Sequence, residues 1–204
     1  MKKLNLFLLS SAILAAACNN SSNSGSGNTD TSATATESAG TLQDDDLIEF
    51  VHEAAKGGML EVELGKLAET QALNKRVKAF GAMMVKDHTQ AGDELKALAA
   101  TKNITVPSTL TEDQLHHLDE LRKKKGVEFD KDYMKMMAND HRDDIEEFEK
   151  MANRGTDPEF KAFAAKTLPV LKAHLDSVKS INKEVKASVD PGEITDGVEV
   201  HPNR

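Results

Sequence analysis

The segment from Asn74 to Thr101 reads NKRVKAFGAMMVKDHTQAGDELKALAAT. Its apolar and small side chains recur three or four residues apart, and it contains no proline. This spacing places those side chains along one face of an α-helix. A single ionisable residue, His88, interrupts the apolar face near its middle. The stretch therefore predicts a long helix that buries a histidine.

Three more segments show the same helical spacing over similar lengths. They run from about Asp44 to Gln71, from about Phe129 to Ala152 and from about Glu159 to Lys186. A shorter helix is expected to begin at Thr111-Glu112-Asp113 and to end near Gly126. No segment alternates apolar and polar residues in the manner of a half-buried strand. The sequence therefore predicts an all-α domain.

The connections between these helices predict their topology. Short turns at 72–73 and 153–157 join the long helices into two hairpins. The connection 102–128 is long enough to travel the length of a bundle, at about 1.5 Å per helical residue. The second and third long helices can then run parallel. We expect a ferritin-like four-helix bundle, with two helical hairpins joined by a long crossover that contains a short helix. Pro169, inside the last helix, predicts a kink.

The first residues of the chain have the features of an export signal. Lys2 and Lys3 precede an apolar run, and small residues lead directly into Cys18, the single cysteine. This order is typical of a secretory signal peptide. A cysteine at that place resembles a bacterial lipobox, in which the thiol is acylated and becomes the new N-terminus. We expect residues 1–17 to be a lipoprotein signal peptide and Cys18 to be lipidated. The alternative is an ordinary secretion signal with an incidental cysteine.

The composition of the remaining segments predicts the domain organisation. Residues 18–43 are mainly Ser, Asn, Gly, Thr and Ala, which predicts a flexible tether, and residues 187–204 lack any period and predict a disordered tail. The helical domain is expected to span 44–186. The formal net charge of −8 argues against a nucleic-acid partner. We expect a lipid-anchored protein of the bacterial cell envelope, at the outer membrane and facing the periplasm, whose partner is the membrane itself.

Each long helix carries one ionisable residue on its apolar face, near the middle of the helix. These residues are Glu61, His88, His141 and His174. A buried and unpaired carboxylate is costly, so Glu61 needs a partner. A divalent transition metal such as zinc, iron, copper or manganese would supply that partner and explain the histidines, because imidazole and carboxylate suit these ions better than calcium. The alternative is a polar network without metal, which fixes the register of the helices.

An internal repeat surrounds two of these histidines. Residues 83–88 and 136–141 both read Met-Met-x-x-Asp-His. The repeat places Asp87 and Asp140 next to a histidine, but adjacent helical residues point about 100° apart. These aspartates are therefore better suited to orienting a neighbouring ligand than to binding the metal. Plain surface charges are the alternative.

Several short motifs occur together between about residues 45 and 183. They are Phe50, Glu61-x-x-x-Gly65-x-x-Ala68, Met84-Val85-x-Asp87-His88, Phe129-Asp130-x-x-Tyr133, His141 and Leu168-Pro169-x-Leu171-x-x-His174. In combination they resemble the bacterial family called domain of unknown function 4142. The resemblance implies a ferritin-like fold behind a signal or lipoprotein sequence. It implies no established activity.

The candidate site departs from that of ferritin-like di-iron proteins, which carry Glu-x-x-His pairs. Val85, Ala138 and Leu171 stand three residues before the three histidines. One core glutamate with three histidines does not build a carboxylate-bridged two-metal centre, so we expect a single ion. A metal-binding protein is favoured over an enzyme. The alternatives are a structural or stress-related envelope protein with a buried Glu/His network, and a metal-dependent redox enzyme.

Overall fold

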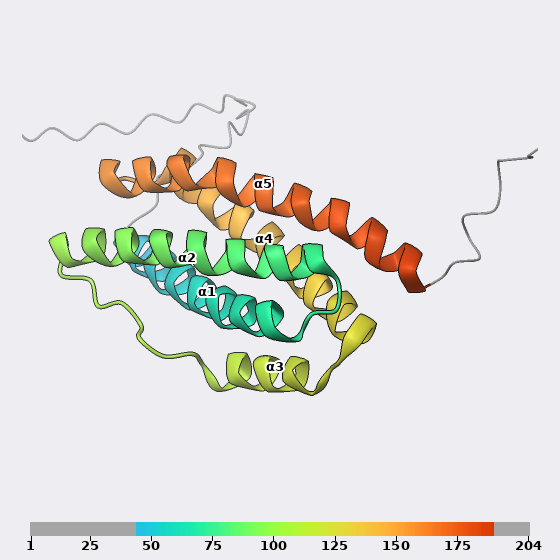
Figure 1. Ribbon diagram of the computed structural model, residues 1–204. Helices are drawn as coiled ribbons and strands as arrows, with labels where there is room; N and C mark the ends of the chain where they lie inside the picture. The colour runs from blue at the N-terminus through green and yellow to red at the C-terminus, as the bar shows by residue number, and fades with distance from the viewer. Residues whose placement is uncertain (1–43, 190–204) are drawn as a thin grey trace, which may run out of the picture. The chain divides into compact units, whose positions relative to one another are not determined.

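The computed structural model describes residues 44–189, and these residues form five helices (Figure 1). The helices are α1 (Asp44–Gln71), α2 (Lys75–Thr101), α3 (Glu112–Lys123), α4 (Gly126–Arg154) and α5 (Pro158–Val189). Within the described range no residue belongs to a strand, and only an isolated bridge links Ala72 to Gly126. The predicted all-α class is therefore confirmed.

Some expectations concern residues that the structure does not describe. The signal peptide, Cys18 and the tether fall within 1–43, and most of the predicted tail falls within 190–204, so all of these lie outside the described residues. The last helix continues to Val189, three residues beyond the predicted end of the domain at Lys186. Among the described helices, none has the length and apolar character needed to cross a membrane.

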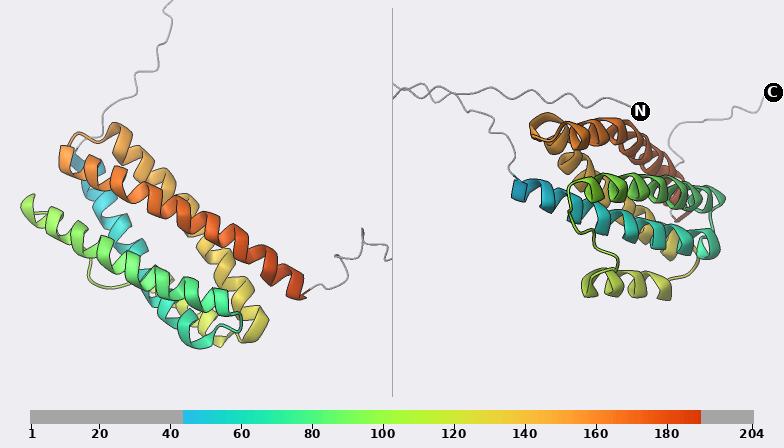
Figure 2. Two further views of the ribbon diagram at one scale, coloured as in Figure 1. Left: turned by 45° about the horizontal axis from the view of Figure 1, so that its top comes forward. Right: turned by 90° about the vertical axis from the view of Figure 1, so that its left-hand side faces the viewer.

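The four long helices are arranged as two hairpins. α1 packs mainly against α2, and α4 packs mainly against α5 (Figure 2). The segment 102–125, which contains α3, returns the chain to the end at which α2 begins, where Ala72 meets Gly126. α2 and α4 therefore start at the same end and run in the same direction.

Side chains from α1 hold this long connection in place. The Nε2 atom of His52 lies 2.9 Å from the carbonyl oxygen of Thr105. Gln71 donates from Nε2 to the carbonyl oxygen of Arg122, at 3.1 Å. α3 itself begins at a capping box, in which Thr111 and Gln114 each accept a hydrogen bond from the other's backbone N–H. These bonds satisfy backbone groups that the crossover would otherwise leave without partners.

A buried carboxylate fixes the turn of the first hairpin to α4. Asp130 accepts hydrogen bonds from the backbone N–H groups of Leu73 and Asn74, at 2.9 and 2.7 Å. Asn74 caps α2 by accepting from the N–H of Arg76, at 2.7 Å. Asp130 is only 2% exposed. The start of α2 and the first turns of α4 are therefore held in a defined register, which positions the residues two to four turns further along both helices.

Two glycines let α1 and α2 approach closely. A Cβ atom at Gly65 would lie 2.7 Å from the carbonyl oxygen of Gly81, and one at Gly81 would lie 2.7 Å from the carbonyl oxygen of Gly65. Real Cβ atoms do not come this near to a backbone oxygen, so only glycine fits both positions. Gly65 lies one turn after Glu61, and Gly81 lies two turns before His88. The crossing therefore brings these two side chains together.

The core consists of two apolar clusters with a polar layer between them. One cluster includes Leu64, Met84, Tyr133 and Val178, and the other includes Val51, Leu95, Phe148 and Leu171. On α2, α4 and α5 the buried histidines fall in the gap between the two clusters. Pro169 is exposed and lies inside α5, which is one continuous helix. The kink at this residue stays a prediction.

Candidate metal centre

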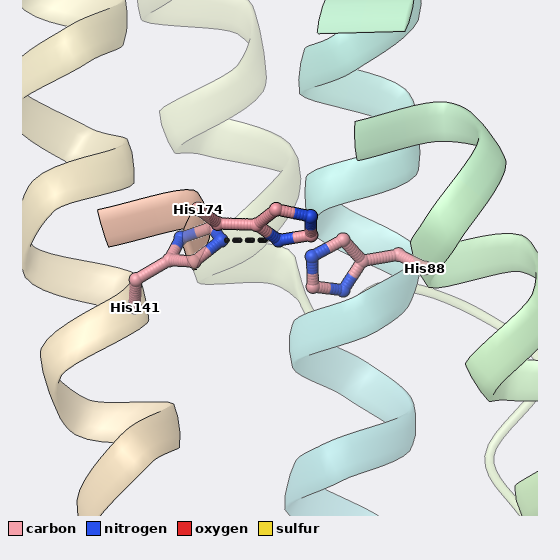
Figure 3. Close-up of side chains that lie close together, drawn as sticks. All are labelled: His88, His141 and His174. Atoms are coloured by element: carbon pink, nitrogen blue, oxygen red, sulfur yellow. Dashed lines mark hydrogen bonds between the residues drawn. The ribbon is translucent and has the colours of Figure 1, made fainter. Parts of the chain in front are cut away.

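Four helices each contribute one buried ionisable side chain to the polar layer. Glu61, His88, His141 and His174 are 1%, 8%, 0% and 2% exposed. The imidazoles come from α2, α4 and α5 and point toward one another (Figure 3). Each offers a nitrogen atom within 4.8 Å of the nitrogens of the other two. The arrangement is thus a compact group of three imidazoles.

Two of the histidines form the centre of a hydrogen-bonded row. The Nδ1 atom of His141 lies 2.9 Å from the carbonyl oxygen of Met137, and its Nε2 atom lies 3.2 Å from Nδ1 of His174. The Nε2 atom of His174 lies 3.1 Å from Oδ2 of Asp87. A carbonyl oxygen and a carboxylate, both acceptors, therefore stand at the two ends of the row.

Two neutral imidazoles carry too few protons to make every hydrogen bond in this row. A neutral imidazole carries one N–H and one lone pair. If His141 donates to Met137 and His174 donates to Asp87, the two nitrogens that face each other both present lone pairs. A third proton, placed between these two nitrogens, would restore a hydrogen bond but would make one imidazole a cation. A metal ion placed between the two nitrogens would satisfy both lone pairs without that charge.

The burial of the site keeps its imidazoles neutral. Burial, together with the neighbouring histidines, lowers the pKa of His141 from 6.5 to about 3. Burial also lowers the pKa values of His88 and His174. Asp87 acts in the opposite direction on His174, but its effect is smaller than that of burial. Near neutral pH the three rings are therefore in the form that binds metals.

Glu61 lies beside two of the imidazoles. Its Oε2 atom is 2.8 Å from Nδ1 of His88, and its Oε1 atom is 3.1 Å from Nδ1 of His141. Even so, neither carboxylate oxygen receives a well-directed hydrogen bond within the described part of the chain, and the same is true of Nε2 of His88. Burial raises the pKa of Glu61 well above its ordinary range, and the negative charge of Asp140 adds to this. The site therefore needs a proton or a cation at Glu61.

The structure adds a second carboxylate that the sequence analysis missed. Asp144 lies one turn after His141 on α4 and lines the same pocket as Glu61, His88 and His174. Burial and the charge of Glu61 raise the pKa of Asp144 well above its ordinary range. The available signal was the spacing His141-x-x-Asp144, because residues three apart are neighbours on a helix. The apolar face of α4 passes instead through Ile145, so the apolar pattern does not mark Asp144.

The two aspartates of the internal repeat occupy different places. Asp87 contacts His174, as described above. Asp140 instead lies near Glu61 and Tyr133. Its negative charge therefore raises the pKa of both groups. One Asp140 oxygen is buried and has no hydrogen bond from the described residues. Burial raises the pKa of Asp140 from 3.8 to about 6.

A pocket of about 150 Å³ opens from this centre. Its inner end is formed by Glu61, His88, Asp144 and His174. Its outer lining includes Lys166 and Val170, which are exposed. The pocket therefore connects the buried imidazoles to the surface between α2 and α5.

The described residues thus form an all-helical domain whose core is crossed by a layer of buried histidines and carboxylates. The chain belongs to the family described as "Domain of unknown function (DUF4142)", whose model matches residues 31–181. The resemblance stated from the sequence is therefore confirmed. The chain matches none of the curated proteins with which it was compared.

Solved structures of another helical family share the fold. A DUF305 fragment from Deinococcus radiodurans superposes with a TM-score of 0.61 at 8% identity, covering 71% of this chain and 99% of that one. A protein from Streptomyces coelicolor named "putative secreted protein DUF305" superposes with a TM-score of 0.60 at 12% identity, covering 69% of this chain and 93% of that one. At these identities the likeness concerns the fold alone.

Proposed function

We propose that this domain binds one divalent transition-metal ion, held by His88, His141 and His174 with Glu61 as a carboxylate ligand. The main support is the contact between His141 and His174, whose nitrogens face each other at 3.2 Å with no proton left for that contact when both rings are neutral. Two nitrogens bound to one tetrahedral ion, each about 2.0–2.1 Å from it, are about 3.3–3.4 Å apart. Zinc, iron, copper and manganese are the candidate ions.

The neighbouring groups support this proposal. Asp87 and the Met137 carbonyl hold the outward nitrogens of His174 and His141, which leaves the inward nitrogens free to bind an ion. Asp144 lies close enough to supply a second negative charge. Two carboxylates, three neutral imidazoles and one divalent ion give a centre with no net charge. The surrounding frame, two hairpins joined by a returning crossover, supports a ferritin-like bundle.

Metal analysis tests the proposal. The full chain carrying Cys18→Ser, which removes the lipidation site, is incubated in turn with zinc, iron, copper and manganese and then desalted. We expect about one ion per chain for at least one of these metals. The His141→Ala variant should retain no ion. The matched control replaces both His116 and His117, which are exposed on α3 and should be dispensable. A wild-type chain that stays free of all four metals would contradict the proposal.

The leading alternative is a polar network that only fixes the helix register. Replacing both His88 and His174 with leucine separates the two accounts. If the network serves only the register, the free energy of unfolding of the double variant should be unchanged or higher in the presence and in the absence of metal. If the domain binds metal, the wild type should be stabilised by the ion and the double variant should not.

We also propose that the protein is an exported lipoprotein, anchored through Cys18 in the bacterial envelope and facing the periplasm from the outer membrane. The order of basic, apolar and small residues before Cys18 supports this. The structural relative from Streptomyces coelicolor also carries the word "secreted" in its name. The tether 18–43 would hold the helical domain clear of the lipid headgroups.

A further inference from the structure

The pocket between α2 and α5 leads directly to the proposed ion. We propose that it admits a compact, uncharged molecule with one nitrogen or oxygen lone pair, which binds the metal as a fifth ligand beside the four protein donors. This inference rests on the proposed metal site. It goes further by assigning an exchangeable ligand and the chemical class of that ligand.

The position of the pocket supports an open coordination site. His88, His174 and Glu61 line the inner end of the pocket, whereas His141 does not belong to its lining. The protein therefore holds the ion from the closed side through His141, while the other donors flank the opening. Gly58 places no side chain between His88 and the pocket, whereas a Cβ added there would lie in van der Waals contact with Nδ1 of His88, at 3.9 Å.

The volume and the lining of the pocket determine the size and the apolar character of the ligand. Its volume is about 150 Å³. An apolar protein cavity of about this volume accepts a molecule of the size of benzene. Phe148, Phe163 and Leu171 form part of the wall, together with small residues such as Ala54 and Ala91. An apolar body of about six heavy atoms fits these walls, and a single polar atom can reach the ion.

The charges around the pocket select against anions. Asp87, Asp144 and Glu61 all lie in the lining. Lys166 also lines the pocket, but its Nζ atom is paired with Glu94 at 2.7 Å. A divalent ion balances Glu61 and Asp144 and leaves no surplus positive charge for an anionic ligand. A neutral molecule with an N–H or O–H group can also donate a hydrogen bond to a carboxylate.

The test uses cobalt(II) as the probe metal and imidazole as the probe ligand. Imidazole is uncharged near pH 8, has the required lone pair and is small enough for the pocket. We load the Cys18→Ser chain with cobalt, remove the excess and titrate imidazole while recording the visible absorption. A saturable change in the spectrum, with cobalt still bound after dialysis, is expected. Azide, an anion, should bind at least about tenfold more weakly than imidazole.

Two variants test whether the ligand enters through the pocket. Ala91→Phe fills the pocket from α2 and should weaken imidazole binding by about tenfold or more, which corresponds to about 1.4 kcal/mol. Its matched control is Ala97→Phe on the exposed side of α2, which should change nothing. Should Ala91→Phe disturb the fold, Gly58→Ala serves instead, because its methyl group meets only ordinary contacts. It should weaken imidazole binding several-fold and leave the cobalt content unchanged.

The possible outcomes separate this inference from the proposed function. If the wild type retains no cobalt or other metal, the metal site itself is wrong. If cobalt is retained but imidazole leaves the spectrum unchanged, the site stands and the open position is wrong. If imidazole binds equally well to Ala91→Phe, Gly58→Ala and the wild type, the ligand does not use the pocket. If azide binds as tightly as imidazole, the preference for uncharged ligands is wrong.

Discussion

At the scale of single residues, the buried acids and imidazoles act on stability in opposite directions as the pH changes. The raised pKa of Asp140, about 6 against 3.8, means that the folded chain holds a proton that the unfolded chain has released, so this residue reduces stability as the pH rises from about 4 to 6. The pKa of His141 is lowered to about 3 from 6.5. Its contribution to stability is therefore present above pH 6.5 and is lost as the pH falls toward 3.

The Asp140→Asn variant removes the contribution of Asp140 to the pH dependence of stability. In metal-free protein, the free energy of unfolding of the variant should rise relative to that of the wild type by up to about 3 kcal/mol between about pH 4 and pH 7, since each pKa unit corresponds to about 1.36 kcal/mol. Urea unfolding at a series of pH values measures the difference. Asp176→Asn, at an exposed position on α5, is the control and should show no such trend. A difference for Asp140→Asn that stays constant with pH would contradict the assigned burial.

The sequence predicted part of the site for a clear physical reason. Glu61, His88, His141 and His174 interrupt regular apolar faces, and a regular face has to point inward, so their mutual approach followed from helical periodicity. Asp144 was missed because it lies beside the apolar face of α4, so the apolar pattern does not mark it, although its spacing of three residues from His141 does. The contact between Asp87 and His174 joins α2 to α5, and no pattern within one helix encodes it.

At the scale of secondary-structure elements, glycine decides how closely α1 and α2 pack. Gly65 and Gly81 place the two backbones in contact, and this contact brings Glu61 close to His88.

A glycine also determines where α4 begins. Gly126 adopts a φ of 58°, in the region that favours glycine, so α4 begins there and not at Phe129 as predicted. The connection before it is correspondingly shorter, and α3 ends at Lys123.

Gly81→Ala tests the crossing. The new Cβ would lie 2.7 Å from the carbonyl oxygen of Gly65, so one backbone has to move. We expect the free energy of unfolding to fall by about 1–3 kcal/mol, as for other overpacked sites. Gly92→Ala, on the same helix, is the matched control, because its Cβ would meet nothing within 4 Å. Helix propensity alone should stabilise that variant by up to about 1 kcal/mol. Equal effects at the two positions, measured by chemical denaturation, would rule out the close crossing.

At the scale of the whole molecule, the polar layer lies between two apolar clusters and separates them. All four long helices meet at this layer, so an ion bound there connects both hairpins. The all-α class was predictable because every long segment shares the helical period. The pocket was not, since it depends on how side chains from four helices fill the space between them.

Metal binding at this layer should stabilise the entire helical domain. A ligand that binds only the folded state at one hundred times its dissociation constant adds about 2.7 kcal/mol to the free energy of unfolding. Differential scanning calorimetry should therefore show a higher midpoint temperature with metal, which a chelator reverses. The shift should disappear in His141→Ala. A shift of the same size in that variant would place the ion elsewhere on the molecule.

The proposed anchor makes its own prediction for the whole chain. In a bacterial host, the wild type should be found in the membrane fraction, and Cys18→Ser should move the protein to the soluble fraction, because acyl chains provide its attachment. Fractionation followed by immunoblotting measures the distribution. Mass spectrometry of the wild-type N-terminus checks for the acylated cysteine. Recovery of Cys18→Ser in the membrane at the wild-type level would contradict lipid anchoring through this residue.

Anomalous scattering from crystals grown with zinc would locate the proposed ion directly. We expect one strong peak in the polar layer, about 2.0–2.1 Å from one nitrogen each of His88, His141 and His174. A layer without any peak, or zinc found only at exposed carboxylates, would contradict the proposed metal site.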